Sequence, residues 1–253
     1  MKVSVLSSGS KGNTTYIETD NAKILIDIGN TSKYVKEKLE GFGVDPHSLD
    51  AILITHTHAD HIKGLKVFEN KYHIPVYLTK IMHKSLDFVD NYVYIDKEEF
   101  DVNDIYVTPI KTSHDAPDSR GYVISNNGKS IVYITDTGYI NVKYFDILKN
   151  RNIYIMESNH DVEMLTNGRY PFNLRQRILS DKGHLSNLDS SKYLSNFIGD
   201  NTKYILLAHL SEENNTEILA YETLVNRLNE DKKKVDNIII AKQDKETDLI
   251  VIW

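Results

Sequence analysis

The sequence contains no cysteine, which excludes disulfides and thiolate metal sites, so any metal site must use histidines and carboxylates. Its 5 prolines and 12 glycines are scattered and no flexible linker divides the chain, so we expect a single domain over residues 1–253. No signal-peptide core follows Met1, and no apolar run is long enough to cross a membrane. We therefore expect a cytoplasmic protein without membrane insertion.

Positive charges are fewer than negative ones, with 30 Lys and Arg against 36 Asp and Glu. The chain carries a net charge of −6, which argues against a generic binder of phosphate groups. An acidic chain can still be a nucleic-acid enzyme, because divalent cations at its site would offset negative charge locally. The positions of the basic residues are therefore more informative than their sum.

The hydrophobic pattern alternates between strand-like and helix-like segments. Strands are predicted over residues 3–6, 14–19, 23–27, 51–54, 75–78, 105–110, 122–125, 130–135, 153–156, 203–208, 235–241 and 249–253. Helices are predicted over residues 32–39, 61–72, 142–149, 174–179, 188–198 and 216–229. Helices that cover the outer faces of two stacked sheets make a four-layer αββα sandwich, so we expect an α+β fold with two mixed β-sheets.

The most informative motif follows a short apolar strand. Residues 55–61 read T-H-T-H-A-D-H, which has the H-x-H-x-D-H spacing of a two-metal hydrolase. Residues two apart in an extended segment share a face, so His56 and His58 can bind one ion. Asp60 and His61 are out of phase with that pair and can reach a second ion. The alternative is a polar loop whose histidines only form hydrogen bonds.

Three further residues, each just after an apolar strand, complete a ligand set: His114, Asp136 and His209. Alone, they would be interpreted as a surface histidine, a turn former and a core histidine, but the nearby motif favours metal binding. We predict that one ion is held by His56, His58 and His114, the other by Asp60, His61 and His209, and that Asp136 bridges them. This mixed nitrogen and oxygen set suits two divalent metal ions, zinc or manganese, without distinguishing between them.

In their order along the chain, these motifs resemble those of the metallo-β-lactamase superfamily over nearly the whole sequence. More narrowly, six segments resemble the YycJ (WalJ) family of Gram-positive bacteria: residues 6–13, 135–139, 157–165, 168–171, 183–187 and 208–211. The resemblance implies an αββα sandwich with a dinuclear site at one edge of the paired sheets, and an Asp27 that braces the histidine loop. It also implies a metal-dependent nuclease or phosphodiesterase, with exonuclease activity on DNA and an association with a cell-wall two-component regulatory system.

The implied chemistry is metal-assisted hydrolysis, in which a water between the ions attacks phosphorus. Asp60 would also orient that water. His184 follows a glycine, as in related phosphodiesterases, and would protonate the leaving oxygen or bind phosphate; the alternative is a histidine hydrogen-bonded to backbone at a helix start. His160, with Asp161 beside it to orient the ring, would contact substrate or support a metal ligand; a structural role is the alternative.

Basic, aromatic and small polar residues are candidates for binding the substrate. The candidate contacts are Arg169, Tyr170, Arg175, Ser8 and Asn13. Tyr170 could stack on a base, and the arginines could bind phosphate. A helix here would place Arg175 and Arg177 on different faces, so not all of these cations can reach one substrate. For Ser8 and Asn13, the alternative is a tight turn between two strands.

Three functions remain open from the sequence. The first is a metal-dependent nuclease, most simply a DNA exonuclease. The second is a hydrolase of a small phosphodiester or another ester, and the third is a non-catalytic, metal-stabilised regulatory module. A complete ligand set with a bridging aspartate argues against the third, because a structural site needs no open coordination position. The sequence does not determine the oligomeric state.

Overall fold

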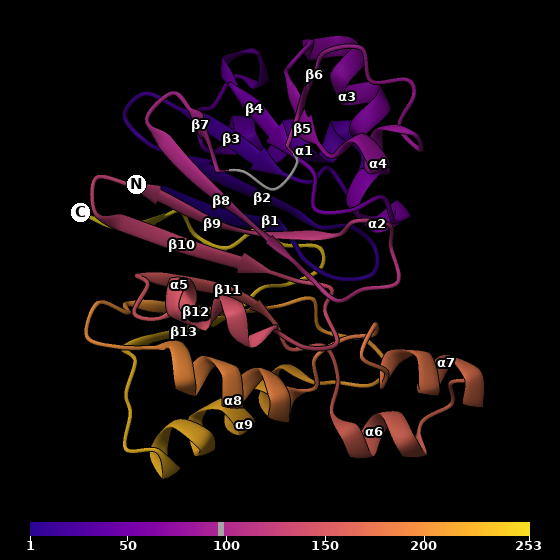
Figure 1. The fold of residues 1–253 in the computed structure, drawn as a ribbon, viewed down its shortest axis with the longest axis vertical. Coiled ribbons are helices and arrows are strands. Elements are labelled where there is room, and N and C mark those ends of the chain that lie inside the picture. Colours follow the sequence, from indigo (N-terminus) through magenta and orange to yellow (C-terminus); the bar gives the residue numbers. More distant parts are fainter. Residues whose placement is uncertain (96–98) are drawn as a thin grey trace.

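The computed structural model describes residues 1–95 and 99–253, and across these residues the strands form two seven-stranded sheets. The sheets stack face to face, and helices lie on the outside (Figure 1). The first sheet has the spatial order β14 (Ile250–Val251), β1 (Lys2–Ser7), β2 (Thr14–Glu18), β3 (Lys23–Ile26), β4 (Ala51–Leu53), β5 (Val76–Leu78) and β6 (Tyr92–Tyr94). The second has the order β13 (Asn237–Ile240), β12 (Tyr204–Ala208), β11 (Ile153–Glu157), β10 (Lys129–Ile134), β9 (Arg120–Asn126), β8 (Ile105–Lys111) and β7 (Phe100–Val102).

The helices divide between the two outer faces. Along the chain, the helices that lie between strands of the first sheet are α1 (Ser32–Gly41), α2 (Ala59–Ile62), α3 (Leu65–Tyr72) and α4 (Lys80–His83). The second sheet is covered by α5 (Phe145–Leu148), α8 (Asn187–Phe197) and α9 (Glu217–Glu230). Two short helices, α6 (Val162–Asn167) and α7 (Phe172–Ile178), project beside the end of this sheet (Figure 1). The predicted four-layer α+β sandwich is therefore confirmed.

The apolar residues form three layers that hold the sandwich together. Between the sheets, Ile24 and Ile26 of β3 pack with residues of the second sheet such as Tyr122 and Ile124. The intervening Leu25 faces the other way, under α1 and α3, as the period-two geometry of a strand requires. A third layer lies between the second sheet and helices α8 and α9. Each fully buried aliphatic side chain of this kind stabilises the fold by about 1.5–3 kcal/mol.

Both sheets are mixed, and their parallel parts determine where functional loops gather. The strands β3 to β6 run parallel to one another, as do β10 to β13, whereas the remaining pairs are antiparallel. The carboxyl ends of parallel strands lie at one edge of a sheet, which is where open α/β sheets bind ligands. The loops after β4, β10, β11 and β12 meet at this edge, and the two chain termini lie at the opposite end (Figure 1).

The structure differs from the sequence-based expectation in several places, and β6, β7 and α4 were not predicted. The single helix predicted over residues 61–72 is split into α2 and α3, because the chain turns at Gly64, where an added Cβ would lie 2.2 Å from the carbonyl oxygen of Asn30. Helix α6 was not predicted, and η2 (Val142–Tyr144) replaces the first turn of the helix predicted over residues 142–149. None of the helices in the two described ranges has the length and hydropathy that a bilayer crossing requires.

Candidate metal centre

The histidine loop leaves β4 and is fixed by a buried carboxylate. Asp27 is fully buried and accepts hydrogen bonds from the backbone N of Thr55 at 2.8 Å and from its Oγ1 at 2.7 Å. The same carboxylate lies 2.7 Å from His61 Nδ1, so this ring nitrogen carries a proton and Nε2 faces the cluster. Burial opposes charge on His61, but Asp136 and Asp27 outweigh it and raise the pKa of His61 to about 10. The expected bracing role of Asp27 is thus visible in its contacts.

The first group of candidate ligands contains His56, His58 and His114, whose ligand atoms lie within 4.8 Å of one another. His114 Nδ1 lies 3.2 Å from the carbonyl oxygen of Gly183 and donates to it, which leaves a lone pair on Nε2. That Nε2 lies 3.2 Å from His58 Nδ1, close to the spacing of about 3.3 Å between two nitrogens in a tetrahedral zinc shell. His56 Nε2 is buried and has no partner among the described residues. Three ring nitrogens therefore converge where a cation would satisfy them.

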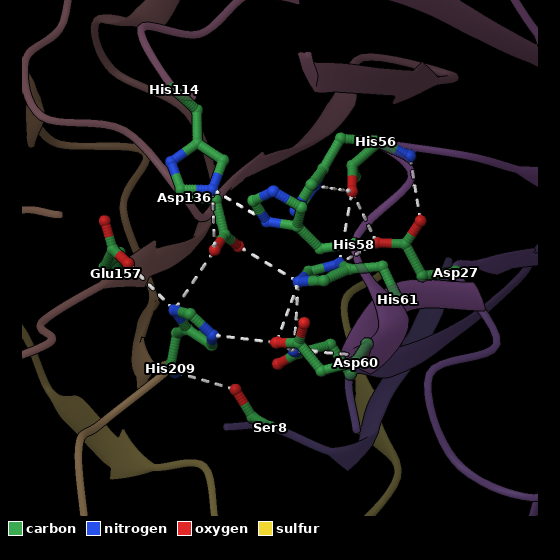
Figure 2. A network of polar contacts seen from close by, with 12 residues as sticks. Ser8, Asp27, His56, His58, Asp60, His61, His114, Asp136, Glu157 and His209 are labelled. Atoms are coloured by element: carbon green, nitrogen blue, oxygen red, sulfur yellow. Dashed lines mark hydrogen bonds and ion pairs between the residues drawn. The ribbon is translucent and has the colours of Figure 1, made fainter. Parts of the chain in front are cut away.

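The second group contains Asp60, His61 and His209, which also lie within 4.8 Å of one another. His209 Nδ1 lies 2.8 Å from Glu157 Oε1, so it carries a proton and Nε2 turns toward the cluster. Asp60 Oδ2 lies 3.5 Å from His209 Nε2 and 3.5 Å from His61 Nε2 (Figure 2). In both His61 and His209, Nδ1 is hydrogen-bonded to a buried carboxylate, and Nε2 faces the cluster.

Asp136 lies between the two groups. Its Oδ2 is 3.2 Å from His61 Nε2, and its Oδ1 is 3.7 Å from His114 Nε2. One of its oxygens also lies within 4.8 Å of ligand atoms of His56 and His61. Asp136 is 3% exposed, and burial alone would raise its pKa, but the surrounding histidines hold the pKa well below the ordinary value. A buried carboxylate in this position can bridge two cations (Figure 2).

Three site residues share an uncommon backbone conformation. Asp27, Asp136 and His209 have φ angles of 59°, 55° and 56°, in the left-handed region. Each comes one or two residues after the end of a strand. Only a few per cent of residues other than glycine adopt this conformation, and such residues cluster at functional sites. At each of these residues the backbone changes direction at the edge of the sheet, and the side chain of the residue then points toward the cluster.

Glu157 is a functional candidate that the sequence analysis missed. It is fully buried at the end of β11, and its Oε1 lies 2.7 Å from His184 Nδ1 and 2.8 Å from His209 Nδ1. Burial raises the pKa of Glu157, but the two histidines outweigh it and lower the pKa to about 2. The sequence did contain a signal for Glu157, because it is an acidic residue at the end of an apolar strand. Asp136 and His209 were predicted from similar positions, just after apolar strands.

His184 lies beside the candidate ligands, and its predicted catalytic role stays a prediction. It lines a cavity of about 230 Å³ together with residues from both groups of candidate ligands. Burial opposes a charge on His184, but the hydrogen bond to the Glu157 carboxylate outweighs it and raises the pKa of His184. The remaining cavity walls come from loops and from α7: Ser10, Asp115, Asn159, Tyr170, Leu174, Arg177, Ile178, Lys182, Gly183, Leu210 and Ser211.

His160 does not line this cavity. Its side chain is 1% exposed, both ring nitrogens are without a hydrogen-bond partner among the described residues, and burial lowers its pKa to about 4. Asp161 does not orient the ring but caps α6 by accepting from the backbone N of Met164 at 2.9 Å. The backbone carbonyl of His160 accepts from the backbone N of Asn187 at 2.8 Å, which ties the end of β11 to the start of α8. The position favours the structural alternative.

Ser8 and Asn13 face the ligands and not the substrate cavity, because both side chains are buried and occupied. Ser8 Oγ accepts from the backbone N of His209 at 2.7 Å. Asn13 Nδ2 donates to Asp60 Oδ2 at 3.2 Å and lies 3.0 Å from His61 Nε2. Their predicted role as phosphate donors at the rim stays a prediction, and in the structure they contact candidate ligands of the second group.

The basic residues of this region also differ in whether they line the cavity. Arg175 reaches back from α7 and donates from Nη1 to the carbonyl oxygen of Thr166, so it joins α7 to α6. Arg169 is exposed and is not part of the cavity wall, whereas Tyr170 is. Arg177 lies on the other face of α7, lines the cavity, and pairs through Nε with Asp115. Arg175 and Arg177 lie on different faces of α7, as expected, and of the two only Arg177 lines the cavity.

Comparisons with known proteins agree with this architecture. Residues 23–195 match a family model described as Beta-lactamase superfamily domain. Over 239 residues, the chain is 41% identical to the exodeoxyribonuclease WalJ of Streptococcus pneumoniae, which covers 90% of this chain and 88% of WalJ. It is 40% identical over 224 residues to the exodeoxyribonuclease YycJ of Bacillus anthracis, which covers 86% of this chain and 85% of YycJ. The crystal structure of the metallo-β-lactamase fold protein YhfI from Bacillus subtilis aligns with a TM-score of 0.74 at 16% identity, over 98% of this chain and 99% of that chain.

Proposed function

Because this chain belongs to the metallo-β-lactamase superfamily, and within it to the group of the WalJ and YycJ proteins, we propose that it is a metal-dependent phosphodiesterase that degrades DNA as an exonuclease. The observation that carries the proposal is the convergence of histidines and carboxylates from both sheets on one cavity, with Asp136 between the two groups. Since both halves of the chain supply these residues, we propose that residues 1–253 work as one domain. A DNA substrate also fits a cytoplasmic location.

Two divalent ions, zinc or manganese, fit the donor chemistry. The buried Nε2 atoms of His56 and His209 lack hydrogen-bond partners among the described residues, and lone pairs of His58 and His114 face each other. A cation satisfies all of these atoms, whereas a proton can satisfy only some of them. We propose that His56, His58 and His114 hold one ion, that Asp60, His61 and His209 hold the other, and that Asp136 bridges them. When bound, such ions lower the pKa of a shared water and neutralise charge on phosphate oxygens.

His184 is the proposed general acid. Its Nδ1 is hydrogen-bonded to the Glu157 carboxylate, which raises the pKa of the ring and so favours its protonated form. In the proposed reaction the other ring nitrogen, Nε2, gives its proton to the oxygen that leaves phosphorus. Glu157 remains ionised and compensates the charge on the ring before the proton moves.

Asp60 is the proposed group that orients the attacking water. Burial raises the pKa of Asp60, but its contacts with His209 and His61 outweigh this effect and lower it, so the carboxylate stays ionised. Asn13 donates to Asp60 Oδ2 at 3.2 Å and restricts the rotation of the carboxylate. An ionised, fixed carboxylate can accept a hydrogen bond from water and align it for in-line attack.

On the substrate side, we propose Tyr170, Arg177 and Lys182 as the contacts in place of Arg169 and Arg175. All three line the cavity beside His184. Arg177 and Lys182 can bind the phosphate that flanks the cleaved bond, and Tyr170 can stack on the terminal base. Arg177 is already oriented by its pairing with Asp115, so little conformational freedom is lost on binding.

The test uses purified protein loaded with Mn²⁺ or Zn²⁺ and given end-labelled duplex DNA, end-labelled single strands or bis(p-nitrophenyl) phosphate. The proposal predicts metal-dependent release of mononucleotides from DNA. Turnover of the small ester alone would instead support a small-molecule phosphodiesterase. Absence of turnover with either metal, while metal binding persists, would support a metal-stabilised regulatory module and overturn the proposal.

A further inference from the structure

A second cavity is lined by residues that neighbour His114 and Asp136 in the chain. It has a volume of about 150 Å³, which is ample for a phosphate group because a single water needs about 10–15 Å³ of such volume. Its wall consists of Lys111, Thr112, Ser113, Tyr139, Asn141, Lys143 and Tyr144. None of these residues is acidic, in contrast to the metal cavity, whose wall includes three aspartates.

The two lysines of this cavity have little competing negative charge. Lys111 Nζ lies 4.0 Å from Asp118 Oδ1, the limit of an ion pair, and Asp118 is engaged by Arg120 at 2.8 Å. Lys143 Nζ lies 4.8 Å from the centroid of the Tyr144 ring. The Tyr144 hydroxyl accepts from the backbone N of Lys111 at 3.1 Å, which leaves its own hydrogen available to an acceptor. The cavity therefore offers cations and hydrogen-bond donors, which is the chemistry that binds an oxyanion.

Hydrogen bonds connect the two loops that line this second cavity, and the same loops carry the candidate metal ligands His114 and Asp136. The backbone N of Gly138 donates to the carbonyl oxygen of Ser113 at 2.9 Å, and the backbone N of Ser113 donates to Thr137 Oγ1 at 3.0 Å. These bonds hold together the two loops, each of which contributes residues to both cavities. Lys111 and His114 are three positions apart in the chain, so their Cα atoms are at most about 11 Å apart. A strand that enters the metal cavity can reach the second one within a few nucleotides.

Tyr139 adds a stacking surface at the mouth of the second cavity. Tyr139 lines the cavity and is 41% exposed, so a base can reach it from solvent. An exposed ring beside lysines is the arrangement that proteins use to bind single-stranded nucleic acid, with the base on the ring and the phosphate on the cation. Because the chain has a net charge of −6, it does not attract DNA as a whole. A local cluster of cations such as this one can supply that attraction.

We propose that this cavity is a second phosphate-binding subsite, which holds a backbone phosphate of the DNA strand a few nucleotides from the bond that is cleaved. Lys111 and Lys143 bind the phosphate, and Tyr139 stacks on the neighbouring base. The inference rests on the proposed nuclease function and adds a length requirement to it. Substrates too short to span both cavities lose this contact, and longer strands gain affinity from it.

The test compares wild type with the double variant Lys111→Ala/Lys143→Ala on three substrates: bis(p-nitrophenyl) phosphate, a dinucleotide and a single strand of about a dozen nucleotides. For the long strand we expect KM to rise roughly three- to tenfold, with kcat little changed, because exposed charge contacts are individually weak. The dependence of log KM on log salt concentration should also become shallower by about one unit for the lost phosphate contact. The two short substrates should be unaffected.

Matched controls separate a local from a general effect of charge or aromatic loss. Lys192→Ala removes an exposed lysine of α8 that is paired with Asp189 and lines neither cavity, and it should leave KM for the long strand unchanged. Tyr139→Ala should raise KM for the long strand, whereas Tyr221→Ala, at a comparably exposed tyrosine of α9, should not.

Each result has a distinct meaning. If wild type cleaves DNA and the double variant keeps its KM and salt dependence, the subsite is refuted while the nuclease function stands. If the variant loses binding of inorganic phosphate but keeps its KM for the long strand, the cavity holds a free anion and the proposed strand contact is wrong. If wild type cleaves none of the three substrates, the nuclease proposal itself fails, and binding of the uncleaved long strand still tests the subsite.

Discussion

The two halves of the molecule contribute to the metal centre in different ways. The first sheet supplies four candidate ligands from one continuous loop after β4, at residues 56–61. The second sheet supplies His114, Asp136 and His209 from the ends of three separate strands. The segment of the first half is braced by Asp27, whereas in the second half Glu157 contacts His209 and the backbone N of Thr137, next to Asp136. The candidate ligands of the first half are therefore specified by a local sequence motif. Those of the second half are brought together by the order of the strands in the sheet.

The largest expected effect comes from the residue that joins the two groups. Asp136→Ala should abolish metal-dependent turnover, because it removes the only carboxylate that contacts candidate ligands of both groups among the described residues. His58→Ala, which removes one ligand of the first group, should also abolish turnover but leave the second ion bound. Circular dichroism establishes that both variants are folded, and elemental analysis counts the ions in each. Wild-type rates in both would refute the ligand assignment.

The next effect separates chemistry from metal binding. His184→Ala should slow DNA hydrolysis by roughly 10²–10⁴-fold while both ions stay bound, as expected for loss of a general acid. The matched control is His83→Ala, which removes a histidine that is hydrogen-bonded to Tyr94 and lines no part of the metal cavity. If His184→Ala loses metal, His184 is a ligand and the second half supplies one more than we propose.

The two bracing carboxylates give a direct comparison of the halves. Asp27→Asn and Glu157→Gln should each weaken metal binding by about 10- to 100-fold, the usual cost of removing a partner of a ligating histidine. Glu157→Gln should also reduce kcat at saturating metal, because Glu157 holds the proton on His184, whereas Asp27→Asn should not. Metal titration followed by kinetics at saturation distinguishes the two. Identical behaviour of the variants would remove the proposed division of roles.

The pH dependence of metal binding follows from the raised pKa of His61. In the metal-free protein this pKa is about 10, above the unfolded value of about 6.5. The contribution of this proton to stability is therefore complete below about pH 6.5 and is lost as the pH rises through 10. Metal must displace the proton, so its affinity should increase by roughly tenfold per pH unit through the neutral range. Calorimetric titrations at several pH values measure this slope, and a flat profile would contradict the account.

The smallest effect concerns the two faces of α7. Arg177→Ala should raise KM for DNA by about two- to fivefold, because it removes one partly exposed cation from the cavity wall. Arg175→Ala serves as the control, since this side chain contacts the carbonyl oxygen of Thr166 and not the cavity. Steady-state kinetics on the same strand compares them. An equal rise in KM for both variants would mean that α6 and α7 act as one unit on the substrate.

The same contrast explains what could be predicted from the sequence. The ligands at residues 56–61 are adjacent in the chain, so their spacing alone indicates a metal site. His114, Asp136 and His209 were found because they follow apolar strands, and parallel strands bring such positions to one edge. The α+β sandwich followed from the alternation of strand and helix patterns. Local periodicity and spacing therefore predicted most of the fold and the candidate ligands.

What could not be predicted depends on side-chain direction and burial. Glu157 was overlooked because an acidic residue at a strand end is usually solvated, and its two histidine partners come from distant segments. Ser8 and Asn13 were assigned to the substrate because nothing local shows that they turn inward. Arg175 and Arg177 were known to face differently, but which face of α7 meets the cavity depends on how the helix docks. These choices are made by tertiary packing.

The central claim is that the two sheets hold a pair of cations between them, and anomalous diffraction from crystals grown with Mn²⁺ tests it most directly. We expect two anomalous peaks, one beside His56, His58 and His114 and the other beside Asp60, His61 and His209, with Asp136 in contact with both. A cavity without peaks, or peaks at sites away from these residues, would contradict it.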